Sequence, residues 1–262
     1  MAMALQFADF YPLLFLAPFL VLEIVHRARR YTAPPGWRLR GLAVALAIFG
    51  VTIAAGVAWS KVLPEWSLVD GAALGTWGGA LAGILVYELA HYWYHRAAHA
   101  RGWLWRLGHQ MHHSAESLDA YGALYAHPID AALFTTWAIL AFYPLLGLAP
   151  EAAAIAAAFL AFNAAFQHAN VRTPRWLGYL VQRPESHAVH HGRGIHRDNY
   201  SDLPLWDIVF GTFRNPAPGA EPREAGFYDG ASTRVAEMLA FRDVSRPAGD
   251  DAPRGAPETQ AA

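Results

Sequence analysis

Cysteine is absent from this sequence of 262 residues. Its absence excludes disulfide bonds, cysteine-bound zinc sites and cysteine-bound iron–sulfur clusters. Charged residues are also scarce, at 16% of the chain, whereas soluble globular domains carry about 25%. The formal net charge of -1 provides no electrostatic attraction for nucleic acid, so no nucleic-acid partner is expected.

Apolar residues are abundant instead, at 55% of the chain. Three nearly uncharged stretches are long enough to cross a bilayer as helices: residues 5–25, 41–63 and 72–94. A fourth apolar region, residues 129–166, is interrupted by Pro144, Gly147 and Pro150, which predict a tight turn between two helices. We therefore predict an all-α integral membrane protein with four or five transmembrane or membrane-inserted helices.

Arginine is distributed unequally between the loops. The segment after the first apolar stretch contains Arg27, Arg29, Arg30, Arg38 and Arg40, whereas the next loop contains Lys61 with Glu65 and Asp70. The excess of arginine places the first loop in the cytoplasm. We expect a multi-pass protein, in the cell membrane if the source is bacterial, whose third apolar stretch ends on the cytoplasmic side at His95.

The organisation along the chain follows from these segments. Residues 1–70 are expected to form N-terminal transmembrane helices, beginning with a retained helix, since residues 5–25 are too long for a signal peptide core and no basic residue precedes them. A catalytic domain is expected in residues 71–215, including a membrane hairpin at 129–166. The C-terminal extension, residues 216–262, is expected to contain a short amphipathic helix at 231–244 and disorder from about residue 246.

Histidine is frequent, with 13 copies, and nine of them fall in three clusters: His91, His95 and His99; His109, His112 and His113; and His187, His190 and His191. On a helix, residues at i, i+3 and i+4 lie on one side, so each cluster presents its imidazoles together. Helical histidines one turn apart are a common metal-binding arrangement. Solvated surface histidines or an expression tag would not repeat the spacing HxxHH in two distant segments.

Eight of the clustered histidines are too many for a single ion, because a zinc site uses three or four ligands. The eight are His95, His99, His109, His112, His113, His187, His190 and His191. This number suits two metal ions, each with room for water or oxygen. Imidazole binds Fe, Zn, Cu or Ni, so the ligand type does not identify the metal. A location at the cytoplasmic membrane surface favours chemistry on a lipid.

Residues 88–99 (ELAHYWYHRAAH), 104–114 (LWRLGHQMHHS) and 187–193 (HAVHHGR) resemble the fatty acid hydroxylase/sterol desaturase superfamily. Residues 198–200 (DNY) and 205–213 (LWDIVFGTF) extend the resemblance, which covers roughly residues 75–215. The resemblance implies a di-iron, O2-dependent membrane oxygenase with a cytoplasmic histidine-rich catalytic cap. It also implies that the eight histidines above, together with His168, are the metal ligands, and that the eight are catalytic.

The remaining histidines are interpreted differently. His91 lies one turn before His95, but superfamily members often have an aromatic residue there, so we interpret it as a residue behind the ligands or in the core. His127 is expected to be structural, and His196 is an extra histidine outside the ligand set. Two acidic residues, Asp198 and Asp207, could accept hydrogen bonds from ligand imidazoles, or could form surface salt bridges or helix caps.

The resemblance implies a lipid substrate taken from the bilayer: a fatty acyl chain, a sterol, a carotenoid or an ether lipid. The electrons are expected from a separate ferredoxin or cytochrome b5 with its reductase, because the sequence has no Gly-rich dinucleotide motif, no cysteine and no His-Pro-Gly-Gly haem element. A zinc-dependent membrane lipid hydrolase and a metal transporter remain as alternatives. A hydrolase needs only three or four ligands, and transport sites usually lie near the bilayer midplane.

Overall fold

The computed structural model describes residues 7–247, and these residues form helices joined by loops, with one isolated bridge between Gly192 and Ala225. The long helices are α1 (Tyr11–Val25), α2 (Trp37–Trp59), α3 (Gly75–Ala100), α6 (Pro128–Leu140) and α7 (Pro150–His168). The shorter elements are η1 (Phe7–Phe10), η2 (Gly71–Leu74), α4 (Gly102–Leu104), the π-helix η3 (Trp105–His109), α5 (Gln110–His113), η4 (Ala120–Gly122), the π-helix η5 (Ala141–Leu145), η6 (Arg175–Tyr179), α8 (Pro184–His190), α9 (Pro204–Val209), η7 (Ala231–Thr233) and α10 (Val235–Leu239).

Four helical segments are long and apolar enough to cross a membrane: Ala8–Val25, Trp37–Trp59, Gly71–Ala100 and Pro128–Leu145. They overlap the apolar stretches of the sequence, and α7 adds a fifth apolar helix. The prediction of an all-α membrane protein with four or five such helices is therefore confirmed. The turn predicted between α6 and α7 is also present, with Gly147 at φ +57° and Pro150 as the first residue of α7.

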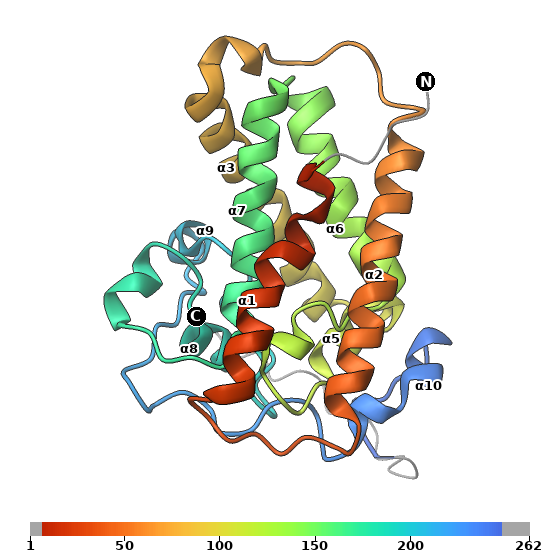
Figure 1. The fold of residues 1–262 in the computed structure, drawn as a ribbon, viewed down its shortest axis with the longest axis vertical. Coiled ribbons are helices and arrows are strands. Elements are labelled where there is room, and N and C mark those ends of the chain that lie inside the picture. The colour runs from red at the N-terminus through yellow and green to blue at the C-terminus, as the bar shows by residue number, and fades with distance from the viewer. Residues whose placement is uncertain (1–6, 248–262) are drawn as a thin grey trace.

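The long helices stand side by side and pack mainly in pairs (Figure 1). α7 packs against both α1 and α3, and α2 packs against α6. Small residues permit the closest approach, because a Cβ atom at Gly79 of α3 would lie 3.0 Å from the Cβ atom of Ala152 in α7. Such small-residue contacts are typical of helix pairs in membranes, where dispersion forces drive packing.

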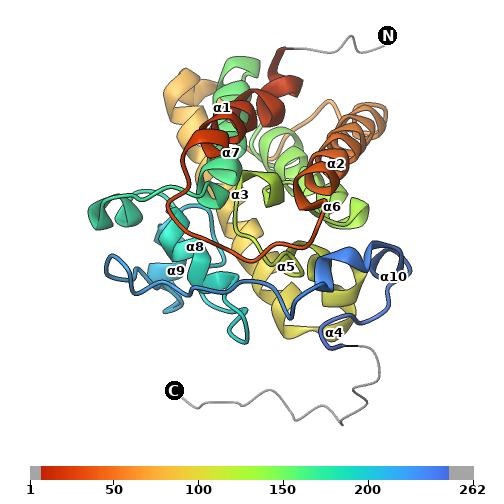
Figure 2. The same ribbon diagram turned by 60° about the horizontal axis from the view of Figure 1, so that its bottom comes forward.

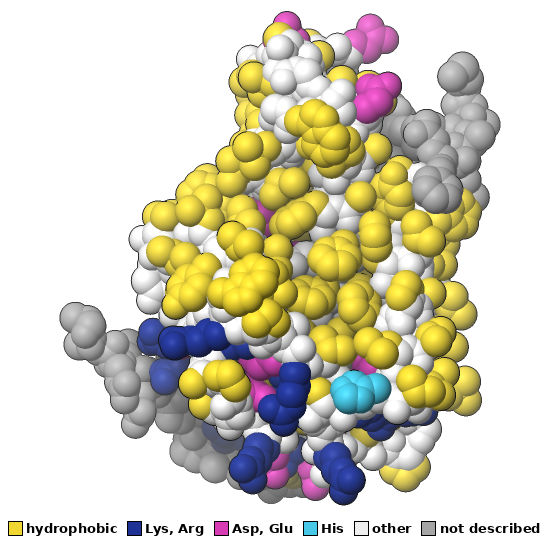
Figure 3. All heavy atoms as spheres, turned by 60° about the vertical axis from the view of Figure 1, so that its left-hand side comes forward, with side chains coloured by type: hydrophobic (Ala, Val, Ile, Leu, Met, Phe, Trp, Pro, Cys, Tyr) yellow, Lys and Arg dark blue, Asp and Glu magenta, His cyan; other side chains and the backbone are white. Residues whose placement is uncertain are grey.

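The short helices α5, α8, α9 and α10 gather at one end of the long helices (Figures 1 and 2). Figure 3 shows an apolar wall above this end, with basic side chains below the wall. The amphipathic helix expected at 231–244 is shorter than expected, since α10 covers only Val235–Leu239. The disorder expected from about residue 246 falls almost entirely outside the described residues.

Candidate metal centre

Four segments bring the predicted ligands together at the end of the long helices where α5, α8, α9 and α10 gather, which we call the cap. His95 and His99 lie in the last turns of α3, where the helix ends before the extended residue Arg101. The second cluster lies on η3 and α5, and the third on α8 and the residue after it. α7 ends at His168. Segments up to about a hundred residues apart in sequence therefore meet in one buried volume.

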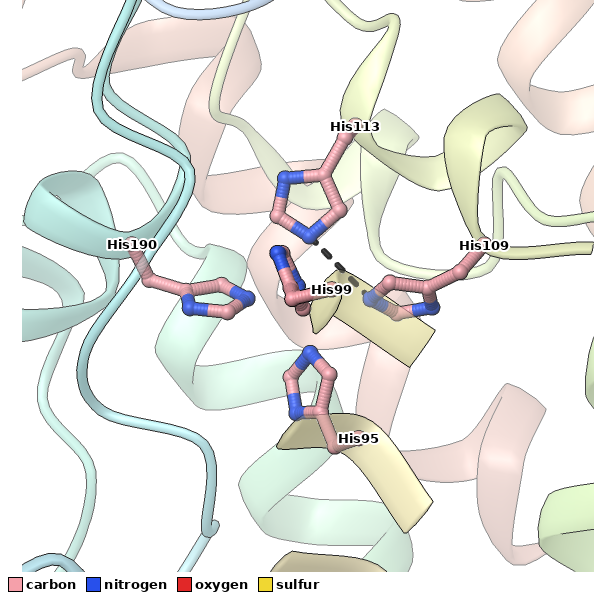
Figure 4. A group of neighbouring side chains, drawn as sticks. All are labelled: His95, His99, His109, His113 and His190. Carbon is pink, nitrogen blue, oxygen red and sulfur yellow. Dashed lines mark hydrogen bonds between the residues drawn. The ribbon is translucent and has the colours of Figure 1, made fainter. Parts of the chain in front are cut away.

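The ring nitrogens form two groups, and within each group the candidate ligand atoms lie within 4.8 Å of one another. The first group is His95, His99, His109, His113 and His190, whose rings point toward a common centre in Figure 4. The second group is His112, His168, His187 and His191. The rings of His113 and His191 stack at 4.1 Å between centroids, so the two groups are adjacent. All nine residues implied as ligands are therefore brought together.

The division between the groups follows helix spacing. His109 and His113 share one group, and the intervening His112 belongs to the other. His187 and His191 also share a group, whereas His190 joins the opposite one. Residues four apart lie one above the other on a helix, while the residue at i+3 is rotated to the side. Each HxxHH segment therefore contributes histidines to both groups.

Backbone carbonyls orient three rings of the first group. Each ring donates its Nδ1–H to a carbonyl oxygen: His95 to Tyr200 (2.7 Å), His99 to His196 (2.8 Å) and His190 to Asp198 (2.7 Å). The Nε2 atoms of the same three rings are buried and have no hydrogen-bond partner in the described structure. A histidine that donates from Nδ1 presents the Nε2 lone pair, and metal-binding histidines characteristically make this second hydrogen bond.

Asp130 orients a fourth ring of the first group, and sequence reasoning missed it. Its Oδ2 atom lies 2.8 Å from Nδ1 of His109, and its Oδ1 atom accepts a hydrogen bond from the hydroxyl of Tyr94 at 2.7 Å. The side chain is almost fully buried. The available signal was a single carboxylate just inside an apolar segment, because such residues are rare in membrane helices and usually functional.

Two pairs of Nε2 atoms approach each other closely. Nε2 of His109 lies 3.1 Å from Nε2 of His113, and Nε2 of His168 lies 3.0 Å from Nε2 of His187. Two such lone pairs repel unless a proton or a metal ion lies between them. Burial lowers the pKa of His187 well below its ordinary value, so the ring is neutral and the gap holds either the N–H of one neutral tautomer or a metal ion. A shared metal ion satisfies both nitrogens.

Three other histidines of the two groups are also neutral at pH 7. Burial lowers the pKa of His190 and His191 well below the ordinary value, and it lowers the pKa of His112 to about 4. Neutral imidazole is the form that binds metal. The donor set therefore fits two metal ions held mainly by imidazole, and nitrogen donors of this kind suit iron, zinc or copper.

His91, His127 and His196 lie outside both groups. His91 lies near Glu88 and Asp202 in a separate buried cluster, and its ring stacks on His95 with centroids 5.4 Å apart. His127 caps α6 by accepting a hydrogen bond from the backbone N–H of Ile129 at 3.1 Å. His196 provides the carbonyl for His99, and its Nδ1 lies 3.1 Å from Nδ1 of His113.

The two aspartates considered in the sequence support the centre in different ways. Asp198 uses its backbone carbonyl for His190, while its carboxylate pairs with Arg214 at 3.2 Å. The carboxylate of Asp207 accepts the backbone N–H groups of Tyr200 (2.8 Å) and Ser201 (2.9 Å). It thereby holds the loop whose Tyr200 carbonyl orients His95. In the described structure, neither carboxylate forms a hydrogen bond with a ring of the two histidine groups.

A cavity of about 200 Å³ adjoins both histidine groups. One wall is formed by His95 and His109 of the first group and by His112, His168 and His187 of the second. The remaining walls come from the membrane helices and are largely apolar, with Ile48 on α2, Phe134 on α6 and Leu160 and Ala164 on α7. Polar side chains interrupt the apolar lining, among them His91, Asp130, Gln167 and Asp202. The arrangement places two candidate metal positions beside a space suited to an aliphatic chain.

The comparison with known families agrees with this geometry. The sequence model of the fatty acid hydroxylase family matches residues 80–212, just over half of the chain and the part that holds all nine histidines. The chain belongs to the fatty acid hydroxylase family. The resemblance that the histidine motifs indicated is thereby confirmed, and the family is one of oxidoreductases.

Several proteins with similar sequences are monooxygenases or hydroxylases by name. An alkylglycerol monooxygenase of Danio rerio is 34% identical over 53% of this chain and 30% of its own length. A sphinganine C4-monooxygenase of Arabidopsis thaliana is 26% identical over 58% of the chain and 59% of its own length. An ornithine lipid hydroxylase of Rhizobium tropici is 31% identical over 59% of the chain and 46% of its own length. The similarity thus spans less than two thirds of each relative, and no solved structure matches the chain.

Proposed function

We propose that this fatty acid hydroxylase family member is a di-iron, O2-dependent membrane oxygenase that hydroxylates or desaturates a lipid. The observation that carries the proposal is the pair of adjacent, buried histidine groups beside a largely apolar cavity between membrane helices. The choice of iron rests on the family and on the nitrogen donors, which suit iron among other metals. The names of the similar proteins support a lipid as the substrate class.

The residues of this chain have separate roles in the proposed reaction. Two iron ions bound by the nine histidines would supply the activation of O2 needed to oxidise an unactivated C–H bond. Asp130 and the carbonyls of Tyr200 and Asp198 keep the Nδ1–H groups of their partner rings occupied, so that the Nε2 lone pairs face the metals. The cavity holds the aliphatic chain beside the centre and excludes bulk water from it.

The substrate and electron donor are proposed on the same basis. An aliphatic chain enters the cavity from the bilayer between the membrane helices. Electrons come from a separate ferredoxin or cytochrome b5 with its reductase, since residues 1–262 contain no Gly-rich dinucleotide motif, no cysteine and no His-Pro-Gly-Gly haem element. We propose that the centre faces the cytoplasm and that the membrane is the cell membrane if the source is bacterial. The support is the arginine-rich loop at the end of the molecule that carries the centre.

Metal analysis of two single variants tests the metal centre. His190→Ala removes a ligand of the first group, and His187→Ala removes a ligand of the second. We expect two iron ions per chain in the purified wild-type protein and a loss of roughly half of the iron in each variant, because each group holds one ion. Both variants should still insert into the membrane. Full iron content in both variants would contradict the assignment of these groups as metal sites.

Lipid analysis tests the reaction. Cells producing the wild-type protein should accumulate a lipid that is heavier by one oxygen atom, or lighter by two hydrogen atoms, than its precursor. Cells producing His190→Ala should not. The measurement is mass spectrometry of total lipid extracts. Stoichiometric zinc with a hydrolysed lipid as product would favour the hydrolase, and weakly held mixed metals without a lipid product would favour the transporter.

A further inference from the structure

A second cavity, of about 670 Å³, lies at the loop between α1 and α2, away from the space beside the histidines. Figure 2 shows this loop crossing the end of the molecule that carries the cap. Its lining includes four arginines, Arg27, Arg29, Arg30 and Arg38, and a single carboxylate, Asp119. The proposed oxygenase reaction uses none of these residues, so the cavity needs an explanation of its own.

The cavity carries a net positive charge. Glu185 and Glu221 neutralise Arg29, with N–O distances of 2.9 and 3.0 Å. Asp119 accepts hydrogen bonds from the indole N–H of Trp37, so its oxygens are already engaged. Arg27, Arg30 and Arg38 form no salt bridge with any carboxylate in the described part of the chain, residues 7–247. Arg38 instead lies over the ring of Tyr121 at 5.3 Å. Arg27 donates from Nε to the backbone carbonyl of Glu23 at 3.2 Å, which leaves its charge unneutralised. The positive charges of these three guanidinium groups are thus left for an anion.

The loop that carries the arginines is held in place. The backbone N–H of Arg29 donates to Oδ1 of Asn170 at 2.8 Å, and Nδ2 of Asn170 donates to the carbonyl of Arg29 at 2.9 Å. The backbone N–H of Ala28 also donates to the carbonyl of Asn170, at 3.0 Å. Glu23 in turn accepts the backbone N–H of Asn170 at 2.7 Å. The guanidinium groups therefore extend from a fixed backbone, which lowers the entropy cost of binding.

The position of the cavity selects the kind of anion. The cavity lies between the end of α1 at Val25 and the start of α2. Leu39, in the first turn of α2, is one of its lining residues. Both side chains are largely exposed, at 82% and 75%, as expected of residues that face lipid. Figure 3 shows basic side chains directly below the apolar wall, and basic residues that flank an apolar helix surface are expected at the headgroup level of a bilayer. A concave space of this size fits a headgroup and is too small for a folded protein partner.

We propose that this cavity binds the phosphate headgroup of an anionic phospholipid. The guanidinium groups of Arg27, Arg30 and Arg38 pair with the phosphate oxygens, for which the planar fork of arginine is well suited. The acyl chains lie along the exposed apolar side chains of α1 and α2. Basic pockets between membrane helices recognise anionic headgroups in this way. The site is separate from the histidine centre, and the proposal does not depend on the oxygenase reaction.

Native mass spectrometry of the full chain in detergent tests the proposal. The probes are dioleoylphosphatidylglycerol and dioleoylphosphatidylcholine, titrated against the wild-type protein and the double variant Arg30→Ala/Arg38→Ala. We expect the wild-type protein to bind one phosphatidylglycerol more tightly than phosphatidylcholine, and the variant to bind phosphatidylglycerol about tenfold or more weakly. The matched control, Arg101→Ala/Arg106→Ala, removes two cap arginines outside the cavity and should bind as the wild type does.

Several outcomes overturn the proposal. They are equal affinity for the two lipids, unchanged binding in the Arg30→Ala/Arg38→Ala variant, and an equal loss in the control. Binding of inorganic phosphate without any preference for phosphatidylglycerol over phosphatidylcholine would show that the cavity binds free phosphate and not a lipid. If size-exclusion chromatography shows that the double alanine variant does not fold, the single variant Arg30→Gln replaces it in the titration. Arg30 is exposed, so this substitution should not disturb folding. It should weaken phosphatidylglycerol binding several-fold, and an unchanged affinity overturns the proposal.

Discussion

Individual rings of the candidate metal centre are oriented mainly by groups other than the histidines. Backbone carbonyls occupy Nδ1 of His95, His99 and His190, and the carboxylate of Asp130 occupies Nδ1 of His109. The negative charge of Asp130 also makes its partner ring a stronger donor to a cation. Asp130 is thus the position where a single substitution should weaken metal binding without removing a ligand.

Asp130→Ala should lower the affinity of the first group for iron by about 10- to 100-fold, the usual effect of removing such a partner. Asp130→Asn should have a smaller effect, because its amide oxygen can still accept the Nδ1–H of His109. Iron retained after dialysis against a chelator of graded concentration measures the difference. Asp198→Asn is the control, since His190 uses only the backbone carbonyl there. Equal iron retention in Asp130→Ala and the wild type would show that Asp130 does not support the metal.

Short elements determine how the second histidine cluster approaches the membrane helices. The π-helix η3 ends at His109, and Gly108 within it lies against α6. A Cβ atom at Gly108 would lie 2.8 Å from the Cβ atom of Asp130 and 3.1 Å from its backbone nitrogen. The glycine therefore lets η3 approach α6 closely enough for His109 to reach Asp130.

Gly108→Ala should push η3 away from α6 and lengthen the hydrogen bond between His109 and Asp130. Overpacking of this kind costs about 1 to 3 kcal/mol, so the thermal denaturation temperature in detergent should fall. The iron content should fall as well, because the displaced ring belongs to the first group. Gly50→Ala is the matched control, since a Cβ atom there meets nothing within 4 Å. Gly50→Ala should leave the denaturation temperature unchanged or raise it, because alanine favours a helix more than glycine does, and the same result for Gly108→Ala would show that the contact tolerates a Cβ atom.

The whole molecule is organised by the pairing of its membrane helices. α1 packs on α7 and α2 packs on α6, and the cavity beside the histidines is lined by residues of α2, α6 and α7. A chain held in this cavity would reach the metal centre from the membrane side. The size of the cavity should therefore decide whether a lipid is oxidised, independently of the metals.

Ala164→Trp should fill the cavity at α7, because Ala164 lines it in the middle of the apolar wall. We expect the lipid product to fall at least tenfold, because the substrate carbon can no longer reach its position beside the centre. The iron content should stay at the wild-type value, since Ala164 is not one of the candidate metal ligands. Leu81→Trp is the control, because Leu81 is 58% exposed on the outer face of α3. Product formation by Ala164→Trp at the wild-type rate would show that the substrate uses another route.

Local patterns in the sequence were sufficient to predict the membrane helices and to select eight histidines of the two groups, while His168 was added by the family resemblance. A hydropathy stretch and an HxxHH spacing depend on residues within one or two helical turns, so they can be recognised without tertiary structure. The tertiary structure alone divided the histidines between two groups and placed Asp130 beside His109. It also placed the carbonyl of Tyr200 beside His95 and formed the arginine cavity around Asn170. These contacts join segments that are distant in sequence, and their geometry depends on how the helices pack, which no local spacing encodes.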